Sequence, residues 1–297
     1  MASLSEILNS KAESKQQRTE SRRAEREQLS QMRDASLMAI TTTPDCYTQY
    51  LVLQGDNIGL SAGNIALALS QMVNPTKIGT TDFWHKQGRY VMDEEMNKGA
   101  SVFVPPRDRN FRGYLMGSYY DVSQTTGRPL KESVPLAEGS ERMNTAFAAL
   151  LDTAPVGFVE NTKLDAPARY NERNCVLEIN TEYSAGQVFA ALATEISYAR
   201  IHDRGMNRDY DRESFQLTAE SIGFMVCRRF GVDCPVPDTA GVEKFYGYYT
   251  PDERGKALDM MRQTARNMGD TVERSIQPRQ QEHNANRGNN PRQFGRR

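Results

Sequence analysis

The sequence predicts an α+β fold, and three observations support this prediction. Two segments rich in β-branched and aromatic residues, 101–105 and 113–122, predict a pair of antiparallel strands. A second pair of short strands is expected at 168–170 and 176–179, after a single strand near 157. The C-terminal half is otherwise mostly helical. The predicted helices lie at 61–73, 82–87, 143–151, 187–202, 214–230 and 250–276.

Changes in composition divide the chain into five parts. The first part is polar, with arginines alternating with glutamates, and is expected to be a solvated helix supported by pairs four residues apart, or a disordered arm. The Arg-rich last part lacks apolar residues and is expected to be disordered. The expected parts are an arm at 1–36, a first module at 37–130, a linker at 131–142, a second module at 143–276 and a tail at 277–297.

The composition is that of a soluble globular protein with polar extensions. Of its 297 residues, 38% are hydrophobic and 25% are charged, and the formal net charge is −1. No apolar run reaches the roughly 18 residues of a membrane-spanning helix, and the first residues do not have the pattern of a signal peptide. The four cysteines have no metal-type spacing and are expected to be reduced thiols. We therefore expect a cytoplasmic protein with no membrane partner, too neutral to coat duplex DNA.

The segment 193–202 has the outline of a zinc-peptidase helix without its metal ligands. In the H-E-x-x-H motif, two histidines one turn apart bind zinc, and the glutamate between them polarises a metal-bound water. The glutamate here is Glu195, but Thr194 and Tyr198 occupy the two histidine positions. A threonine hydroxyl is a poor zinc ligand, and tyrosine is a rare one. We therefore expect Glu195 to be a vestige, with no catalytic residue and no zinc or other cofactor.

Two further residues near this motif, His202 and Glu220, leave alternatives open. His202 lies seven residues after Glu195, and Glu220 can approach from the next helix, so a non-standard metal site is conceivable. In the alternative, the hydroxyls of Tyr198 and Thr194 hydrogen-bond the carboxylates of Glu195 and Glu220. Two carboxylates in one dry site would then raise the pKa of one of them. We expect the polar cluster and keep His202 as the remaining candidate ligand.

Aromatic and basic residues alternate between positions 77 and 112. Proteins that bind single strands combine aromatic faces, on which bases stack, with cations that contact phosphates. The acidic run 93–95 opposes such a surface, and a tryptophan among polar residues is also a common core anchor. The candidate nucleic-acid-binding residues are Lys77, Trp84, Lys86, Arg89, Tyr90, Lys98, Arg107, Arg109 and Arg112.

Two separated stretches contain motifs in a recognisable order. The first comprises the segments 83–91, 97–104 and 119–125, which contain W-x-x-x-G-R-x-V, a K-G strand and a D-x-S-Q-T strand end. The second comprises the helix 187–202 and the A-E-S helix 217–227. In their order and spacing these motifs resemble the ArdC antirestriction family of bacterial mobile elements. The resemblance covers residues 60–130 and 165–275.

The resemblance implies an N-terminal module that binds single-stranded DNA, followed by a zincin-like metallopeptidase module. Glu195 falls on the family's catalytic glutamate and Glu220 on its third zinc ligand. Thr194 and Tyr198 replace the family's two histidine ligands, and His202 matches an additional histidine one turn further on. The chain therefore departs from the family at the positions that bind the metal. The acidic run at 93–95, where relatives tend to have lysines, is a second departure.

The expected function is that of a pseudo-metallopeptidase that binds single-stranded DNA. It would do so by stacking bases on Trp84 and by electrostatic contact, in an antirestriction, mobile-element or phage context. One rival is a virion-associated or scaffolding protein that binds a protein partner through the arm or the Arg-rich tail. A second rival is a working metallopeptidase that uses Glu220, His202 and another ligand around Glu195.

Overall fold

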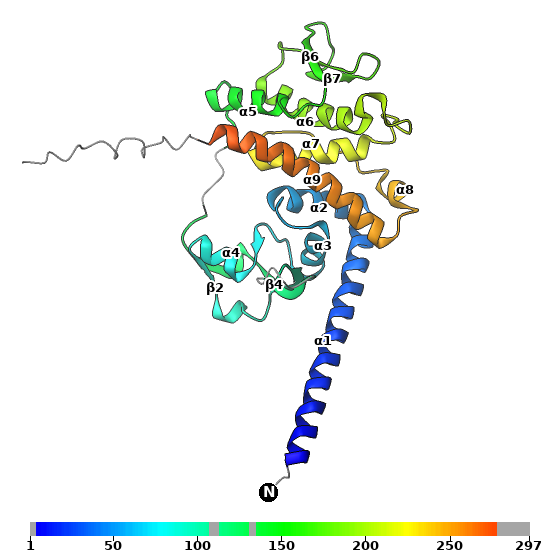
Figure 1. Cartoon of the computed structure of the whole chain (residues 1–297). Helices are drawn as coiled ribbons and strands as arrows, with labels where there is room; N and C mark the ends of the chain where they lie inside the picture. Colours follow the sequence, from blue (N-terminus) through cyan, green and yellow to red (C-terminus); the bar gives the residue numbers. More distant parts are fainter. Residues whose placement is uncertain (1–3, 107–112, 131–134, 278–297) are drawn as a thin grey trace, which may run out of the picture.

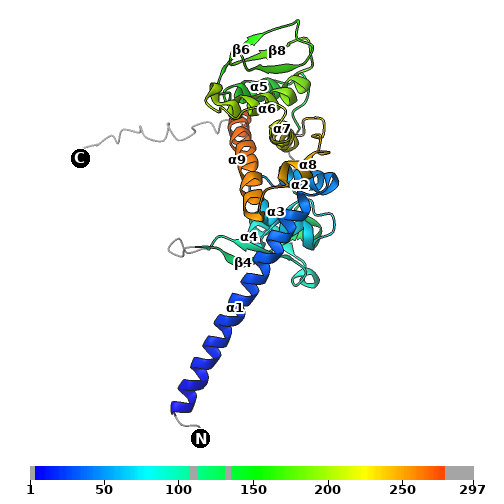
Figure 2. The same ribbon diagram turned by 90° about the vertical axis from the view of Figure 1, so that its right-hand side faces the viewer.

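A long first helix, α1 (Leu4–Ile40), runs out from the body of the molecule, and its N-terminal half stands away from it (Figure 1). The structure is a computed structural model that describes residues 4–106, 113–130 and 135–277. The last helix, α9 (Pro251–Ile276), packs against α1 and continues past it into the other half of the body (Figure 2). These two helices connect the parts that the sequence separates.

Most helices begin at a residue whose side chain accepts a hydrogen bond from the first turn, which satisfies one of the free N–H groups there. Ser184 and Thr250 form full capping boxes with Gln187 and Glu253. The further helices are α2 (Pro44–Asp56), α3 (Ala62–Gln71), α4 (Thr81–Lys86), α5 (Glu141–Leu151), α6 (Ala185–His202), α7 (Gln216–Phe230) and α8 (Val242–Tyr246), with 3₁₀ turns η1 (Asp93–Glu95), η2 (Val122–Gln124) and η3 (Asp203–Gly205).

Three small sheets accompany the helices. In the first, β4 (Leu115–Asp121) lies between β1 (Ile78–Gly79) and β3 (Ala100–Val104) and is antiparallel to both. In the second, β2 (Arg89–Val91) pairs with β5 (Thr125–Gly127). In the third, β8 (Val176–Ile179) is antiparallel to β7 (Ala168–Asn171) and parallel to β6 (Gly157–Glu160). The predicted antiparallel pairs and the α+β class are confirmed.

The hydrophobic core is continuous across both expected modules. Buried side chains form one cluster that extends from Leu29 on α1 to Val272 on α9. Helix α7 packs against α2 from the first half and against α6 from the second, and α9 contacts α1, α3, α5 and α7. The two halves therefore share a core and do not close around two separate ones.

Two expected boundaries fall inside packed elements. The boundary at residue 36 lies within α1, because Leu29, Ser36 and Leu37 are buried against the body and the helix continues to Ile40. The expected linker 131–142 also packs in part. Leu136 is buried and its N–H donates to the Phe230 carbonyl, and α5 already begins at Glu141. Within the described ranges, no helix is long and apolar enough to cross a membrane.

Candidate functional site

Helix α6 places Glu195 in the interior of the second half. Its side chain is almost fully buried, with 8% of the residue exposed. One carboxylate oxygen, Oε2, accepts a hydrogen bond of 2.7 Å from the backbone N–H of Tyr170 on β7. The other, Oε1, accepts one of 2.5 Å from Nη2 of Arg212. The carboxylate therefore joins α6 to a strand edge and to the loop that leads into α7.

Arg212 places a fixed positive charge beside Glu195 and Tyr198. Its guanidinium carbon lies 3.9 Å from the ring centroid of Tyr198, which occupies the second histidine position. Its Nη1 is 3.9 Å from Oε1 of Glu172, which is too long for a hydrogen bond but close enough for charge attraction. One guanidinium thus contacts Glu195, Tyr198 and Glu172 together. Nothing in the motif spacing indicates Arg212, because it lies in the loop after the helix.

Burial sets the direction of the pKa shifts in this cluster. Burial raises the pKa of Glu195, while the hydrogen bonds from Arg212 and Tyr170 oppose that rise. Burial raises the pKa of Tyr198 to about 12. The nearby carboxylates also raise this pKa, whereas the positive charge of Arg212 opposes the rise. Burial alone would lower the pKa of Arg212, but its bond to Glu195 brings the pKa above its ordinary value. The ion pair is therefore the charge state that this environment supports.

The other expected members of the cluster have different partners from those predicted. Glu220 accepts hydrogen bonds from Gln216 Nε2 at 2.8 Å and from the Asp238 N–H at 3.2 Å. The hydroxyls of Tyr198 and Thr194 donate neither to Glu220 nor to Glu195. The predicted hydroxyl–carboxylate cluster is therefore wrong in its pairing, because Arg212, the Gln216 side chain and two backbone N–H groups supply the donors instead.

Thr194 and His202 are also committed elsewhere. A Cβ added at Gly223 of α7 would lie 2.2 Å from Thr194 Oγ1, so the Thr194 side chain lies in the close contact between α6 and α7. His202 Nδ1 is 2.7 Å from the Tyr170 hydroxyl, and its ring packs 4.6 Å from that of Tyr210. His202 therefore belongs to an aromatic cluster at the end of α6.

These residues do not fit a zinc ion. A zinc site needs three well-placed histidine, cysteine or carboxylate ligands. Over the ranges that the structure describes, no three such side chains are grouped to hold a metal ion. The fixed cation of Arg212 would also repel a dication next to Glu195. No chemical step through a metal is derived for this chain.

Trp84 is not an exposed stacking platform, which corrects the prediction made for it. Its side chain is fully buried, and its indole N–H donates to the Tyr120 carbonyl at 3.0 Å. The ring of Phe83 meets it edge-on at 4.9 Å. Trp84 therefore anchors α4 to β4, which is the core role that the sequence left open.

The basic candidates around Trp84 divide into structural and exposed residues. The Arg89 guanidinium donates to Thr125 and to the Arg128 and Val122 carbonyls, so it is used in holding β2 to β5. Lys77 Nζ donates to the Asp56 carbonyl at 2.5 Å, and Lys98 pairs with Glu95. Tyr90, 57% exposed, and Lys86 lie on the surface. The candidates Arg107, Arg109 and Arg112 lie outside the described residues.

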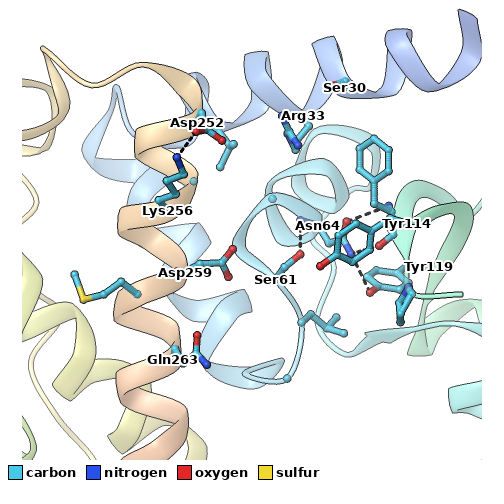
Figure 3. Close-up of a pocket in the computed structure, with 18 of the residues that line it drawn as sticks. Ser30, Arg33, Ser61, Asn64, Tyr114, Tyr119, Asp252, Lys256, Asp259 and Gln263 are labelled. Atoms are coloured by element: carbon cyan, nitrogen blue, oxygen red, sulfur yellow. Dashed lines mark hydrogen bonds and ion pairs between the residues drawn. The ribbon is translucent and has the colours of Figure 1, made fainter. Parts of the chain in front are cut away.

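A groove that the sequence did not predict lies between α1, α3, α9 and the β3–β4 hairpin (Figure 3). Its volume is about 1100 Å³. It brings together segments that are far apart in the chain, from Arg23 on α1 to Asn267 on α9. The side chains that matter for its chemistry are Arg23, Arg26, Arg33, Asn64, Phe103, Tyr114, Tyr119, Lys256, Asp259 and Gln263.

The wall of the groove next to α1 combines aromatic rings with arginines. Arg26 and Arg33 lie over the ring of Phe103, at 5.8 and 6.0 Å from its centroid. Arg26 Nη1 also donates to the Tyr114 carbonyl at 2.7 Å, and Tyr114 is 58% exposed. Asn64 donates to the Phe103 carbonyl and to the Tyr119 hydroxyl, which fixes the strand end. Arg33 is also ion-paired with Asp34. This wall therefore presents the accessible Tyr114 ring beside the positive charge of Arg26.

Acidic side chains also line the groove, but several are already neutralised. Asp259 accepts hydrogen bonds from the Ala62 N–H and from Arg262, and Asp252 forms an ion pair with Lys256. Glu27 also lines the groove; it accepts a hydrogen bond from Gln31 Nε2 and keeps its negative charge. Arg23 and Arg26 are thus the arginines at the α1 end that face the groove without an acidic partner among the described ion pairs. The groove is polar with an electropositive side.

Comparison with known proteins gives a limited likeness. No family model matches the chain, and no curated protein matches it. Two similar solved structures are of the antirestriction protein ArdC from plasmid R388, one metal-free and one with Mn(II) bound. Both share 18% identity and a TM-score of 0.43 with this chain; they cover 72% and 73% of it, and it covers 84% and 85% of them.

Both structures are of the family whose motifs the sequence resembles. A TM-score this low does not establish a common fold, and 18% identity does not transfer a metal site or an activity.

Proposed function

We propose that this chain binds single-stranded nucleic acid in the groove between α1 and α9. The observation that carries the proposal is the wall in which Tyr114 and Phe103 lie beside Arg26 and Arg33. Aromatic faces next to cations are what single-strand binders use, with stacking worth about 1–3 kcal/mol per base. The exposed side chains of Gln263 and Asn267 add amide groups that can hydrogen-bond base edges.

The same features favour a single strand over a duplex. Bases in a duplex are stacked on one another, so their faces cannot reach Tyr114. A duplex binder also needs a broad cationic surface, and the formal net charge of this chain is only −1. Stacking in a groove is therefore the better match to the composition.

We further propose that the chain is not a metallopeptidase. A general base must reach a water molecule next to its substrate, whereas Glu195 is 8% exposed and has both oxygens engaged. Arg212 neutralises this carboxylate without offering the open coordination position at which a catalytic metal activates water. The antirestriction role named for the two ArdC structures is proposed here as the setting, on the strength of the motif resemblance.

Fluorescence anisotropy with single- and double-stranded oligonucleotides over a salt series tests the binding proposal. We expect tighter binding of the single strand, with an affinity that falls steeply as salt rises because phosphate contacts release counterions. Tyr114→Ala should weaken binding about tenfold, in line with the loss of one stacked base. Tyr248→Ala is the matched control, because Tyr248 is 98% exposed but does not line the groove.

Two results would overturn the proposal. Equal weakening by both tyrosine substitutions would show that the groove has no special role. Equal affinity for single and double strands, or no binding at low salt, would remove nucleic acid as the ligand and favour the rival of a protein-binding scaffold.

A further inference from the structure

The projecting half of α1 separates its charges onto two sides. Side chains from Lys11 to Gln28 are all exposed. Basic residues follow one another at intervals of four, three, four and four residues, which places them on one side of a helix. This basic row consists of Lys11, Lys15, Arg18, Arg22 and Arg26.

Acidic residues occupy the opposite side. Glu13, Glu20 and Glu27 recur every seven residues, so they too share one side, about half a turn away from the basic row. There are two exceptions: Glu25 lies beside the basic row and accepts a hydrogen bond from Ser21, and Arg23 lies towards the acidic side, one turn from Glu20 and from Glu27. Within 11–28, a stretch that the structure describes throughout, no ion pair joins two side chains. The pairs four residues apart that the sequence suggested are thus replaced by a segregated charge pattern.

The basic row leads directly to the groove. Its last member, Arg26, lines the groove, lies over Phe103 and donates to the Tyr114 carbonyl. The next residues on the same side, Leu29 and Arg33, are a buried anchor to the body and a second groove arginine. By helical periodicity, the side of α1 that is buried at its C-terminal half, at Leu29 and Leu37, is therefore the side that carries the basic row further out.

We propose that this row is a phosphate track that extends the groove. It would bind the backbone of a single strand whose bases occupy the wall around Tyr114, and so it rests on the function proposed above. From Lys11 to Arg26 the helix rises about 22 Å, which lengthens the contact well beyond the groove. Affinity should therefore depend on oligonucleotide length.

An anionic membrane surface fits the same helix less well. Helices that lie on membranes place a broad apolar face beside their cations. Between Lys11 and Gln28 the apolar side chains are only Ala12 and Ala24. A solvated phosphate backbone is bound by positive charge and needs no apolar burial, and this stretch provides such charge.

Two variants with the same change in net charge test the track. One is Lys11→Gln, Lys15→Gln, Arg18→Gln and Arg22→Gln, which keeps good helix formers on α1. The control removes four exposed cations elsewhere on the body, by Lys163→Gln, Arg173→Gln, Arg208→Gln and Lys244→Gln. Circular dichroism confirms that both remain folded. Binding is measured by anisotropy with thymidine oligonucleotides of increasing length over a salt series.

The track variant should lose about tenfold or more in affinity for long oligonucleotides and keep wild-type affinity for short ones that fill only the groove. The slope of log affinity against log salt should fall by up to about 3, since each single-strand phosphate contact contributes about 0.7. The control should retain the slope and the length dependence of the wild type.

The outcomes separate the track from the groove. The track alone would be overturned if the wild type binds short oligonucleotides and the track variant binds long ones as tightly as the control does. Absence of oligonucleotide binding by the wild type would overturn the groove and the track together. The basic row would be assigned to a membrane surface if the wild type binds vesicles of anionic phospholipid but no oligonucleotide, and the track variant loses the vesicle binding.

Discussion

At the scale of single residues, the clearest departure from a peptidase is Arg212. A guanidinium and a metal ion both neutralise a buried glutamate, but only the metal offers an open coordination position to water. Arg212 pairs with Glu195 and stacks on Tyr198, the residue in the second histidine position. A single loop residue thus accounts for how a buried carboxylate is tolerated at this position.

Removing this guanidinium should destabilise the fold. The Glu195 side chain is 11% exposed and that of Arg212 is 37% exposed. Arg212→Ala leaves the carboxylate buried without its cation, and we expect a loss of about 1–3 kcal/mol, less than for a fully buried pair because solvent screens the arginine. Urea unfolding measures this loss. Arg208→Ala, at an exposed arginine of the same loop, should change little.

The loss should depend on pH with a defined sign. Burial already raises the Glu195 pKa above 4.5, and removal of Arg212 takes away the largest opposing interaction. Below the unfolded-state pKa the carboxyl is protonated in both states, so the substitution costs least there. As pH rises through the raised folded-state pKa, the variant must keep a buried, unpaired carboxylate and loses stability. Unfolding across acid to neutral pH tests this, and a difference from wild type that is independent of pH would contradict it.

Trp84 shows where residue-level prediction from sequence stops. Its place among alternating aromatic and basic residues suggested a stacking surface, but the packing of α4 against β4 buries it completely. That packing depends on Tyr120, 36 residues away, and no local pattern reveals it. Prediction from sequence stops at the same point for the cluster around Glu195. The motif spacing singles out Glu195, Thr194 and Tyr198, but it does not reveal Arg212, the partner of Glu195.

At the scale of elements, local signals predicted most helices. Caps at Ser61, Ser184 and Thr250, and a left-handed Gly231 after α7, mark ends that the sequence located well. Helix α2, which begins after a Thr43 cap, was missed. The parallel pairing of β6 with β8 was also missed, because it joins strands that are not neighbours in the chain. Most elements with clear local signals were thus predicted, with α2 as an exception, whereas the pairing of strands distant in the chain was not.

The contact between α6 and α7 depends on a glycine. A Cβ at Gly223 would lie 2.2 Å from Thr194 Oγ1 and 3.0 Å from the Thr194 nitrogen. Gly223→Ala should therefore push the helices apart and cost about 1–3 kcal/mol, even after its gain of about 1 kcal/mol in helix propensity. Thermal or urea unfolding measures the change.

Gly255→Ala is the matched control for this contact. Gly255 also lies inside a helix, α9, but an added Cβ would meet mainly the flexible tip of Leu37 at 3.2 Å. We expect its stability to remain within about 1 kcal/mol of wild type. Equal stability of the two variants would show that α6 and α7 are not held at their closest approach by Gly223.

At the scale of the whole molecule, the groove arises from the way distant segments meet. Arg26, Asn64, Tyr114 and Lys256 come from four separate elements or their ends, and only the shared core brings them together. Sequence reasoning centred its nucleic-acid surface on Trp84, which is a core residue, and did not predict this groove. The basic row on α1 was the available signal, because its spacing is visible in the sequence alone.

Photo-crosslinking is the most direct test of the central claim that the groove binds a single strand. A thymidine oligonucleotide carrying photoreactive iodouracil is irradiated with the full-length protein, and the crosslinked peptides are mapped by mass spectrometry. Stacking on the groove wall predicts crosslinks at Tyr114 or Phe103, competed by unlabelled single strand. Crosslinks confined to Tyr248 or to the β6–β8 sheet, with none at the groove wall, would contradict the account.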